Sequence, residues 1–121
     1  MATLTIYGLD NSEATKYARH YFRDHDGSVR YVNLGIQGLD GVELQRFLWS
    51  FRLMDLIDTD GDSYRTLAGD RSSVPAGELM SRIGRTPGLL RLPLVRRGGR
   101  LAVGDDEDAW DRIAIGISSK G

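Results

Sequence analysis

Residues 4–32 contain a strand, a helix and a second strand in close succession, and this pattern constrains the fold more than any other feature. Apolar residues run from Leu4 to Tyr7 and stop at Gly8, which is typical of a short buried strand. Residues 29–32 alternate in polarity as a second strand. A helix between two such strands predicts that they are parallel and joined by a right-handed crossover.

Polar residues that can cap a helix follow the first strand. Asp10, Asn11 and Ser12 could each serve as the N-cap, and Asp10 with Glu13 has the D-x-x-E spacing of a capping pair. The helix should end at the D-H-D-G of residues 24–27. Its predicted buried face consists of Ala14, Tyr17, Ala18, Tyr21 and Phe22, which recur at helical spacing.

The middle of the chain predicts further helices. Asp40 and Glu43 form a second D-x-x-E pair. Residues 54–68 are less regular and indicate a polar turn with one short helix. Pro75 suits the start of another helix, and Gly84 can end it. The helix after Asp40 is expected to bury Leu44, Phe47, Leu48 and Phe51.

The last part of the chain reads as a hairpin followed by a helix. Residues 92–95 lead into a strand, R-R-G-G-R at 96–100 is typical of a hairpin turn, and residues 101–103 form the returning strand. Four acidic residues at 105–108 suit the positive end of a helix dipole. That helix should bury Trp110, Ile113, Ala114 and Ile117.

Together these elements predict an α/β fold in which helices cover both faces of a mixed four-stranded sheet, β-α-β followed by β-β-α, as in thioredoxin-like proteins. The 121 residues are expected to form a single domain, 1–121. With 40% hydrophobic residues and a formal net charge of −1, the chain reads as an ordinary globular protein without a strong field toward nucleic acid or membrane. No signal peptide or membrane span is evident, so a cytoplasmic location is expected.

The segment T-P-G-L-L-R-L-P-L-V-R-R-G-G-R-L-A-V-G at 86–104, with its following acidic helix, resembles the signature of the glutaredoxin-dependent arsenate-reductase/Spx family. Members read approximately P-G-L-L-R-R-P, a hairpin, R-L-x-V-G and an acidic helix. Residues 4–22 resemble the first strand, active-site turn and first helix of this family, and residues 56–67 its anion-binding loop. The resemblance covers about residues 3–115 and implies a thioredoxin-like fold with a helical insertion. Pro93 then faces the active-site turn, as a proline that is usually cis in the wider class.

The cysteines of this family have no counterpart here, because the chain contains no cysteine. The resemblance places Ser12 at the nucleophilic cysteine and Thr15 at the second cysteine of the Spx-type C-x-x-C. A serine hydroxyl stays protonated at neutral pH unless a base lies beside it, and thiol–disulfide exchange requires sulfur. The chain therefore cannot carry out thiol chemistry with a cysteine of its own.

The cationic groups that the family uses to bind oxyanions are also reduced. The loop arginine falls at Asp60, a nearby basic residue of the Spx type at Asp62, and the second arginine of R-R-P at Leu92, while Lys16 and Arg91 remain positive. An oxyanion site depends on converging positive charge. These exchanges imply that the ancestral activity is lost and that Ser12, Thr15, Asp60 and Leu92 occupy vestigial positions.

The leading functional hypothesis is a redox-inactive pseudoenzyme that acts as a protein-binding or regulatory module. Spx-type members bind RNA polymerase, so the resemblance implies a protein partner related to transcription, and no cofactor is expected.

The alternative is an arsenate-reductase-like or glutathione-dependent oxidoreductase or transferase that uses an external thiol. Some glutathione transferases of thioredoxin-like fold place a serine where Ser12 lies, which suggests a glutathione or other thiol-peptide site. That site would consist of Ser12, Lys16, Arg91, Leu92 and Pro93. The simpler interpretation of Ser12 is an N-cap worth about 1 kcal/mol.

Two other motifs do not predict a function. Asp58, Asp60 and Asp62 have the 1, 3, 5 spacing of an EF-hand, but Ser63 replaces the glycine and Gly69 the bidentate glutamate. A solvated acidic turn is therefore expected, with no metal. Residues 82–100 contain six arginines and no acids, yet nucleic-acid binding is not expected at a net charge of −1.

Overall fold

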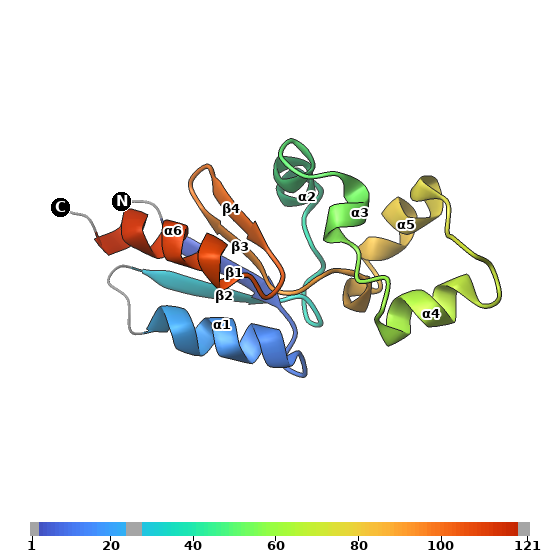
Figure 1. Ribbon diagram of the computed structural model, residues 1–121, viewed down its shortest axis with the longest axis horizontal. Coiled ribbons are helices and arrows are strands. Elements are labelled where there is room, and N and C mark those ends of the chain that lie inside the picture. The colour runs from blue at the N-terminus through green and yellow to red at the C-terminus, as the bar shows by residue number, and fades with distance from the viewer. Residues whose placement is uncertain (1–2, 24–27, 119–121) are drawn as a thin grey trace. The chain divides into compact units, whose positions relative to one another are not determined.

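The computed structural model describes residues 3–23 and 28–118, with side chains as far as Ala114 (Figure 1). The predicted turn at 24–27 and the side chain of Ile117 lie outside these residues. The chain divides into two compact units, Met1–Asn33 with Leu92–Gly121, and Leu34–Arg91. The expectation of a single domain stays a prediction. No helix in the described residues is both long enough and apolar enough to span a membrane.

The first unit contains the predicted mixed sheet. Its strands lie in the order β2-β1-β3-β4, with β1 parallel to β2 and antiparallel to β3, and with β3 antiparallel to β4. The turn between β3 and β4 places Gly98 at a φ of 59°, which favours glycine. The elements are β1 (Leu4–Gly8), α1 (Glu13–Arg23), β2 (Val29–Asn33), β3 (Leu94–Arg97), β4 (Arg100–Val103) and α6 (Glu107–Ser118).

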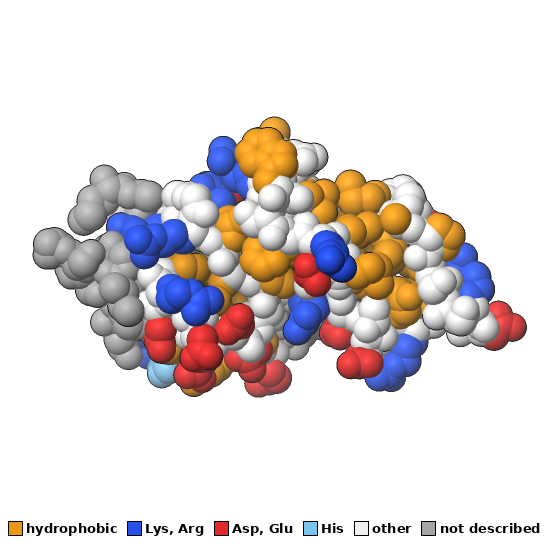
Figure 2. Space-filling model, turned by 45° about the horizontal axis from the view of Figure 1, so that its top comes forward, with side chains coloured by type: hydrophobic (Ala, Val, Ile, Leu, Met, Phe, Trp, Pro, Cys, Tyr) orange, Lys and Arg blue, Asp and Glu red, His pale blue; other side chains and the backbone are white. Residues whose placement is uncertain are grey.

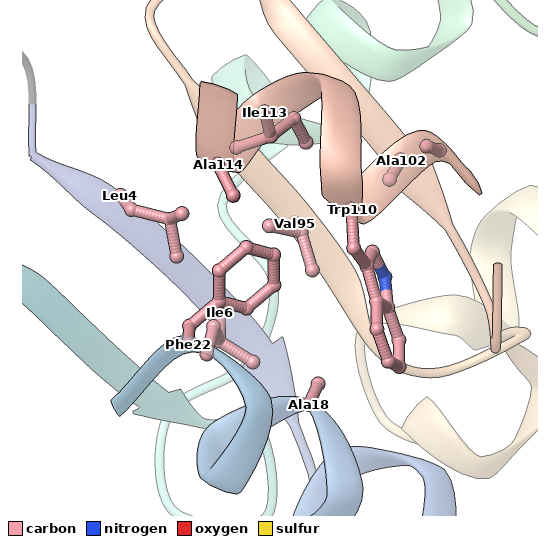
Figure 3. Close-up of a cluster of buried hydrophobic side chains, with 10 residues drawn as sticks. Leu4, Ile6, Ala18, Phe22, Val95, Ala102, Trp110, Ile113 and Ala114 are labelled. Atoms are coloured by element: carbon pink, nitrogen blue, oxygen red, sulfur yellow. The ribbon is translucent and has the colours of Figure 1, made fainter. Parts of the chain in front are cut away.

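The core of this unit lies on one face of the sheet (Figure 3). Ile6 lies opposite Val95, and Val95 opposite Ala102, so these side chains share a face. Helices α1 and α6 both bury side chains against this face, namely Ala18 and Phe22 from α1 and Ala109, Trp110, Ile113 and Ala114 from α6. The expectation that helices cover both faces is therefore not met by α1 and α6, which share one.

The second unit is mostly helical and corresponds to the predicted helical insertion. Residues 54–68 contain two short helices, where the sequence predicted one, and a single turn of 3-10 helix was not predicted. The Asp40 N-cap is confirmed, because its carboxylate accepts a hydrogen bond from Val42 N–H at 2.8 Å. The elements are α2 (Gly41–Leu48), α3 (Leu53–Leu56), α4 (Asp62–Ala68), α5 (Ala76–Ile83) and η1 (Pro87–Leu89).

Candidate functional site

Ser12 is the N-cap of α1. Its Oγ accepts a hydrogen bond from Thr15 N–H at 3.2 Å, and its carbonyl accepts one from Lys16 N–H at 3.0 Å. The turn before it is closed by Ser12 N–H donating to Leu9 O at 3.1 Å. Ser12, which the resemblance predicts at the position of the family's cysteine, is thus half-buried, and its hydroxyl satisfies a backbone donor at the start of the helix.

Asp10 does not cap α1, so the predicted Asp10–Glu13 capping pair is wrong. The Asp10 carboxylate instead accepts hydrogen bonds from Tyr31 Oη at 2.8 Å and from Asn33 Nδ2 at 3.1 Å. Glu13 is exposed and lies 3.1 Å from Lys16 Nζ. Asp10 therefore connects the turn to β2, because its two partners lie on that strand.

Tyr31 lies between a carboxylate and a cation. Burial of its phenol and its hydrogen bond to Asp10 raise the pKa of Tyr31 to about 12, against a smaller opposing effect of Arg19. The Arg19 guanidinium lies 3.9 Å from the centre of the Tyr31 ring, within range of a cation–π interaction.

Thr15, which the resemblance predicts at the position of the second cysteine, is completely buried. Its side chain packs against Gly8, where a Cβ would come within 2.4 Å of Thr15 Oγ1. The Oγ1 atom has no hydrogen-bond partner among the described residues. Because no solvent reaches it, Thr15 has a packing role in this structure.

Pro93 comes to the same end of the sheet as the Ser12 turn. The pairing of Tyr7 with Leu94 places Pro93 beside Gly8, where β1 leads into that turn. The Leu92–Pro93 peptide bond is cis, as the resemblance implied. Pro93 is buried and its carbonyl accepts a hydrogen bond from Gly104 N–H at 2.9 Å, while Leu92 is half-buried.

The acidic loop of the second unit is organised by its own hydrogen bonds. Asp58 accepts one from Asp60 N–H at 3.3 Å, Arg65 donates to Asp60 O, and Asp62 lies 3.4 Å from the Arg65 guanidinium. Within the described residues, no three His, Cys, Asp or Glu side chains form a group that could hold a metal ion.

Arg91 is exposed, and its backbone N–H donates to Leu56 O at 2.7 Å. Asp60 and Arg91 belong to the second unit, whereas Ser12, Lys16, Leu92 and Pro93 belong to the first. The structure brings the Ser12 turn and Pro93 to one end of the sheet. That the predicted site residues of the second unit lie close to those of the first unit stays a prediction.

A pocket lined by basic side chains, which the sequence did not predict, lies beside β2. The pocket has a volume of about 410 Å³ and lies between α1 and the sheet. The spacing of its basic residues at i, i+3, i+4 and i+7 could have revealed it, because that spacing places three cations and a histidine on one helix face. The residues around it are Lys16, Arg19, His20 and Arg23 from α1 and Ile6, Val29 and Tyr31 from the strands.

Solved structures with a similar fold include several related to arsenate reductase. The YFFB protein superposes with a TM-score of 0.80 at 20% identity, covering 92% of this chain and 98% of its own. An arsenate reductase from Vibrio cholerae gives 0.74 at 13% identity, with 96% and 98% covered. At these identities the likeness establishes the fold.

Relatives with higher sequence identity also align with most of this chain. An arsenate reductase related protein from Brucella melitensis is 30% identical, with a TM-score of 0.69 and 91% and 92% of the two chains covered. The global transcriptional regulator Spx of Listeria innocua is 28% identical over 112 residues, covering 91% of this chain and 86% of the regulator. The Staphylococcus aureus regulator of the same name is also 28% identical over the same coverage. The model of the ArsC family matches residues 7–113, and the chain is therefore a member of the ArsC family, with a thioredoxin-like fold and without cysteine.

Proposed function

We propose that this protein is a regulatory, protein-binding member of the ArsC family that takes no part in thiol redox chemistry. The observation that carries the proposal is the use of Ser12 Oγ as the cap of α1. A hydroxyl in this role is a poor nucleophile, because activation would require a neighbouring base to accept its proton. The buried hydroxyl of Thr15, which has no partner among the described residues, offers no substitute for a second thiol.

The transcription apparatus is the first partner to test. Relatives that align over most of this chain are named global transcriptional regulators. Spx-type members bind RNA polymerase, and by analogy we propose that enzyme as the partner in the cytoplasm. Protein binding through a surface needs no catalytic group and is compatible with the loss of both cysteines.

Exposed hydrophobic side chains in the second unit support a protein-binding role. Ile36, Val42 and Trp49 are 84%, 63% and 75% exposed. Figure 2 shows hydrophobic side chains gathered over the part of the chain that contains α3 to α5. Exposed tryptophan is characteristic of interaction surfaces, because a large aromatic side chain buries much area when a partner binds.

The test combines a binding measurement with an activity measurement. Purified protein should bind purified bacterial RNA polymerase in biolayer interferometry, with equal affinity in reducing and oxidising buffer because no thiol is involved. Trp49→Ala should weaken this binding, whereas Gln45→Ala, an exposed position on α2, should not. Turnover of arsenate in the presence of glutathione and glutaredoxin would contradict the proposal.

The second candidate is a thiol-peptide site formed by Ser12, Leu92 and Pro93, with Lys16 and Arg91 as cationic groups. It is favoured by the placement of Pro93 beside the strand that leads into the Ser12 turn. Titration with glutathione, followed by amide NMR shifts, tests it. Saturable shifts confined to residues 9–16 and 91–93 would replace the first proposal with this one.

A further inference from the structure

One flank of α1 carries three cationic side chains and a histidine. Lys16, Arg19, His20 and Arg23 are exposed and lie on the face that borders the pocket beside β2. From the first to the last of them the helix rises by about 10 Å. We refer to these four residues as the α1 cationic stripe.

Among the described residues, no carboxylate lines the pocket that this stripe borders. Two described acids contact residues that line the pocket: Asp10 accepts hydrogen bonds from Tyr31 and Asn33 of β2, and Glu13 pairs with Lys16 at the helix N-terminus. Arg19 and Arg23 are the pocket cations that have no carboxylate partner among the described residues. On the flank toward α6, Tyr17 Oη donates to Glu107. Helix α1 thus meets a negatively charged residue toward α6 and presents cations toward β2.

The strand that borders the pocket is at the edge of the sheet. The order β2-β1-β3-β4 leaves one side of β2 without a neighbouring strand in the described sheet. Val29 and Tyr31 lie opposite Leu4 and Ile6, so they share the face that α1 covers. A further strand added to this edge would place every second side chain below the α1 cationic stripe.

We infer that the α1 cationic stripe and the edge of β2 together form a docking surface for an acidic, extended segment of a protein partner. This inference rests on the proposed protein-binding function. Three residues of extended chain span about 10 Å, the length of the stripe. Carboxylates at alternate positions would meet the cations, and the apolar side chains of Val29 and Tyr31 would contact the segment at the pocket floor.

The geometry favours a peptide over a nucleic acid. An edge strand offers backbone donors and acceptors that match an extended peptide, and a phosphodiester chain has no such pattern. The formal net charge of −1 also opposes a polyanion as large as nucleic acid, whereas a short acidic segment needs only local attraction.

The test uses the full chain and two synthetic peptides. Acetyl-Glu-Val-Glu-Val-Glu-amide should cause saturable amide NMR shifts in residues 16–23 and 29–33. The same peptide with glutamine in place of glutamate should bind about tenfold more weakly, and the acidic peptide should lose affinity when salt rises from about 20 to about 300 mM.

Matched charge reversals localise the site. Arg19→Glu with Arg23→Glu should raise the dissociation constant of the acidic peptide by about tenfold or more. Arg82→Glu with Arg85→Glu makes the same change in net charge at exposed positions of the second unit. This control should leave the dissociation constant of the acidic peptide unchanged. Circular dichroism should show that both variants remain folded.

Three outcomes would overturn the inference: no saturable shifts with the acidic peptide, equal losses in both variants, or tighter binding of oligothymidylate than of the peptide. None of them bears on the proposed function, which is tested separately with the polymerase and Trp49→Ala. If the polymerase binds the wild type and the acidic peptide gives no saturable shifts, the proposed function stands and this docking surface does not.

Discussion

Gly8 and Thr15 are in direct contact: a Cβ at position 8 would lie 2.4 Å from both Oγ1 and Cγ2 of Thr15. One partner ends β1 and the other lies in the first turn of α1, so the contact fixes how closely the helix approaches the strand. A side chain at position 8 would push the two apart.

The first prediction is that Gly8→Ala destabilises the protein by about 2 kcal/mol, because the added methyl overpacks a buried site. Urea unfolding measures the change. Thr15→Ala in the same chain should recover part of the loss, because it removes the two atoms in closest contact. Gly77→Ala is the control, since nothing lies within 4 Å of a Cβ there and the position is helical. Equal stability of Gly8→Ala and wild type would refute the packing argument.

The second prediction concerns the buried hydroxyl of Thr15. Thr15→Val keeps the shape of the side chain and removes a polar atom that has no partner among the described residues. The variant should be more stable, with a free energy of unfolding about 1 kcal/mol higher than that of the wild type. Folding of the wild type buries a hydroxyl without a hydrogen-bond partner among the described residues, and the valine variant avoids this cost. The same exchange at the exposed Thr66 should produce little change. A loss of stability in Thr15→Val would indicate that the hydroxyl has a partner.

The third prediction tests the cap of α1. Ser12→Ala should lower the free energy of unfolding by about 1 kcal/mol, because Thr15 N–H loses its acceptor. Ser12→Asp should keep most of the stability of the wild type, because an aspartate carboxylate can accept the same hydrogen bond. Asn11→Ala, one residue earlier in the same turn, should have a negligible effect. Chemical denaturation of the three variants measures the difference, and an unchanged Ser12→Ala would exclude the capping role.

The fourth prediction is a loss of stability at alkaline pH that depends on Tyr31. Its pKa is raised to about 12 in the folded protein from 10.0. The folded protein therefore favours the neutral phenol of Tyr31 over the phenolate. The contribution of Tyr31 to the free energy of unfolding is complete below pH 10 and is lost as the pH rises toward 12. The hydrogen bond to Glu107 also raises the pKa of Tyr17. Absorbance should therefore show tyrosines that ionise late, and Tyr31→Phe should remove the component near pH 12. Its persistence in Tyr31→Phe would assign it to another tyrosine.

The fifth prediction concerns the ion pair that connects the end of α4 to α5. Arg71 donates two hydrogen bonds to Glu78, at 2.9 and 3.0 Å, and also donates to Leu67 O. The hydrogen bonds from Arg71 hold the pKa of Glu78 below its usual value of 4.5. The pair therefore stabilises the fold above pH 4.5, and this stabilisation is lost as the pH falls through the lowered pKa.

Glu78→Gln should accordingly lower Tm at pH 7 and leave it close to that of the wild type near pH 3. Glu13→Gln, which removes a single exposed contact with Lys16, should change Tm little at pH 7. A Tm difference for Glu78→Gln that is the same at both pH values would show that the charge of Glu78 is not responsible.

The elements that could be predicted are those with a local cause. Asp40 was identified as a cap because no other capping residue competes with it, and the strand at Leu4–Gly8 because Leu4, Ile6 and Tyr7 form a short apolar stretch that ends at a glycine. The capping pair at Asp10 was predicted wrongly because three capping residues stand together, and the partners of Asp10 lie on β2. No local pattern predicts such partners.

Part of the candidate site could also be predicted from the sequence. The resemblance located Ser12 and Pro93, and the structure places both at one end of the sheet. The contact between Gly8 and Thr15 could not be predicted, because it depends on the distance between a strand and a helix. The α1 cationic stripe was visible in the spacing of Lys16, Arg19 and Arg23, but its meaning depends on the edge strand beside it.

The order of strands also affects how the chain folds during synthesis. Strand β1 leaves the ribosome long before its antiparallel neighbour β3, which begins only at Leu94. Until then one edge of β1 has no native partner, and its apolar side chains lack the cover of α6. The nascent chain must therefore extend through β3, β4 and α6 before this sheet can close, and in that interval β1 has an unpaired edge and an exposed apolar face.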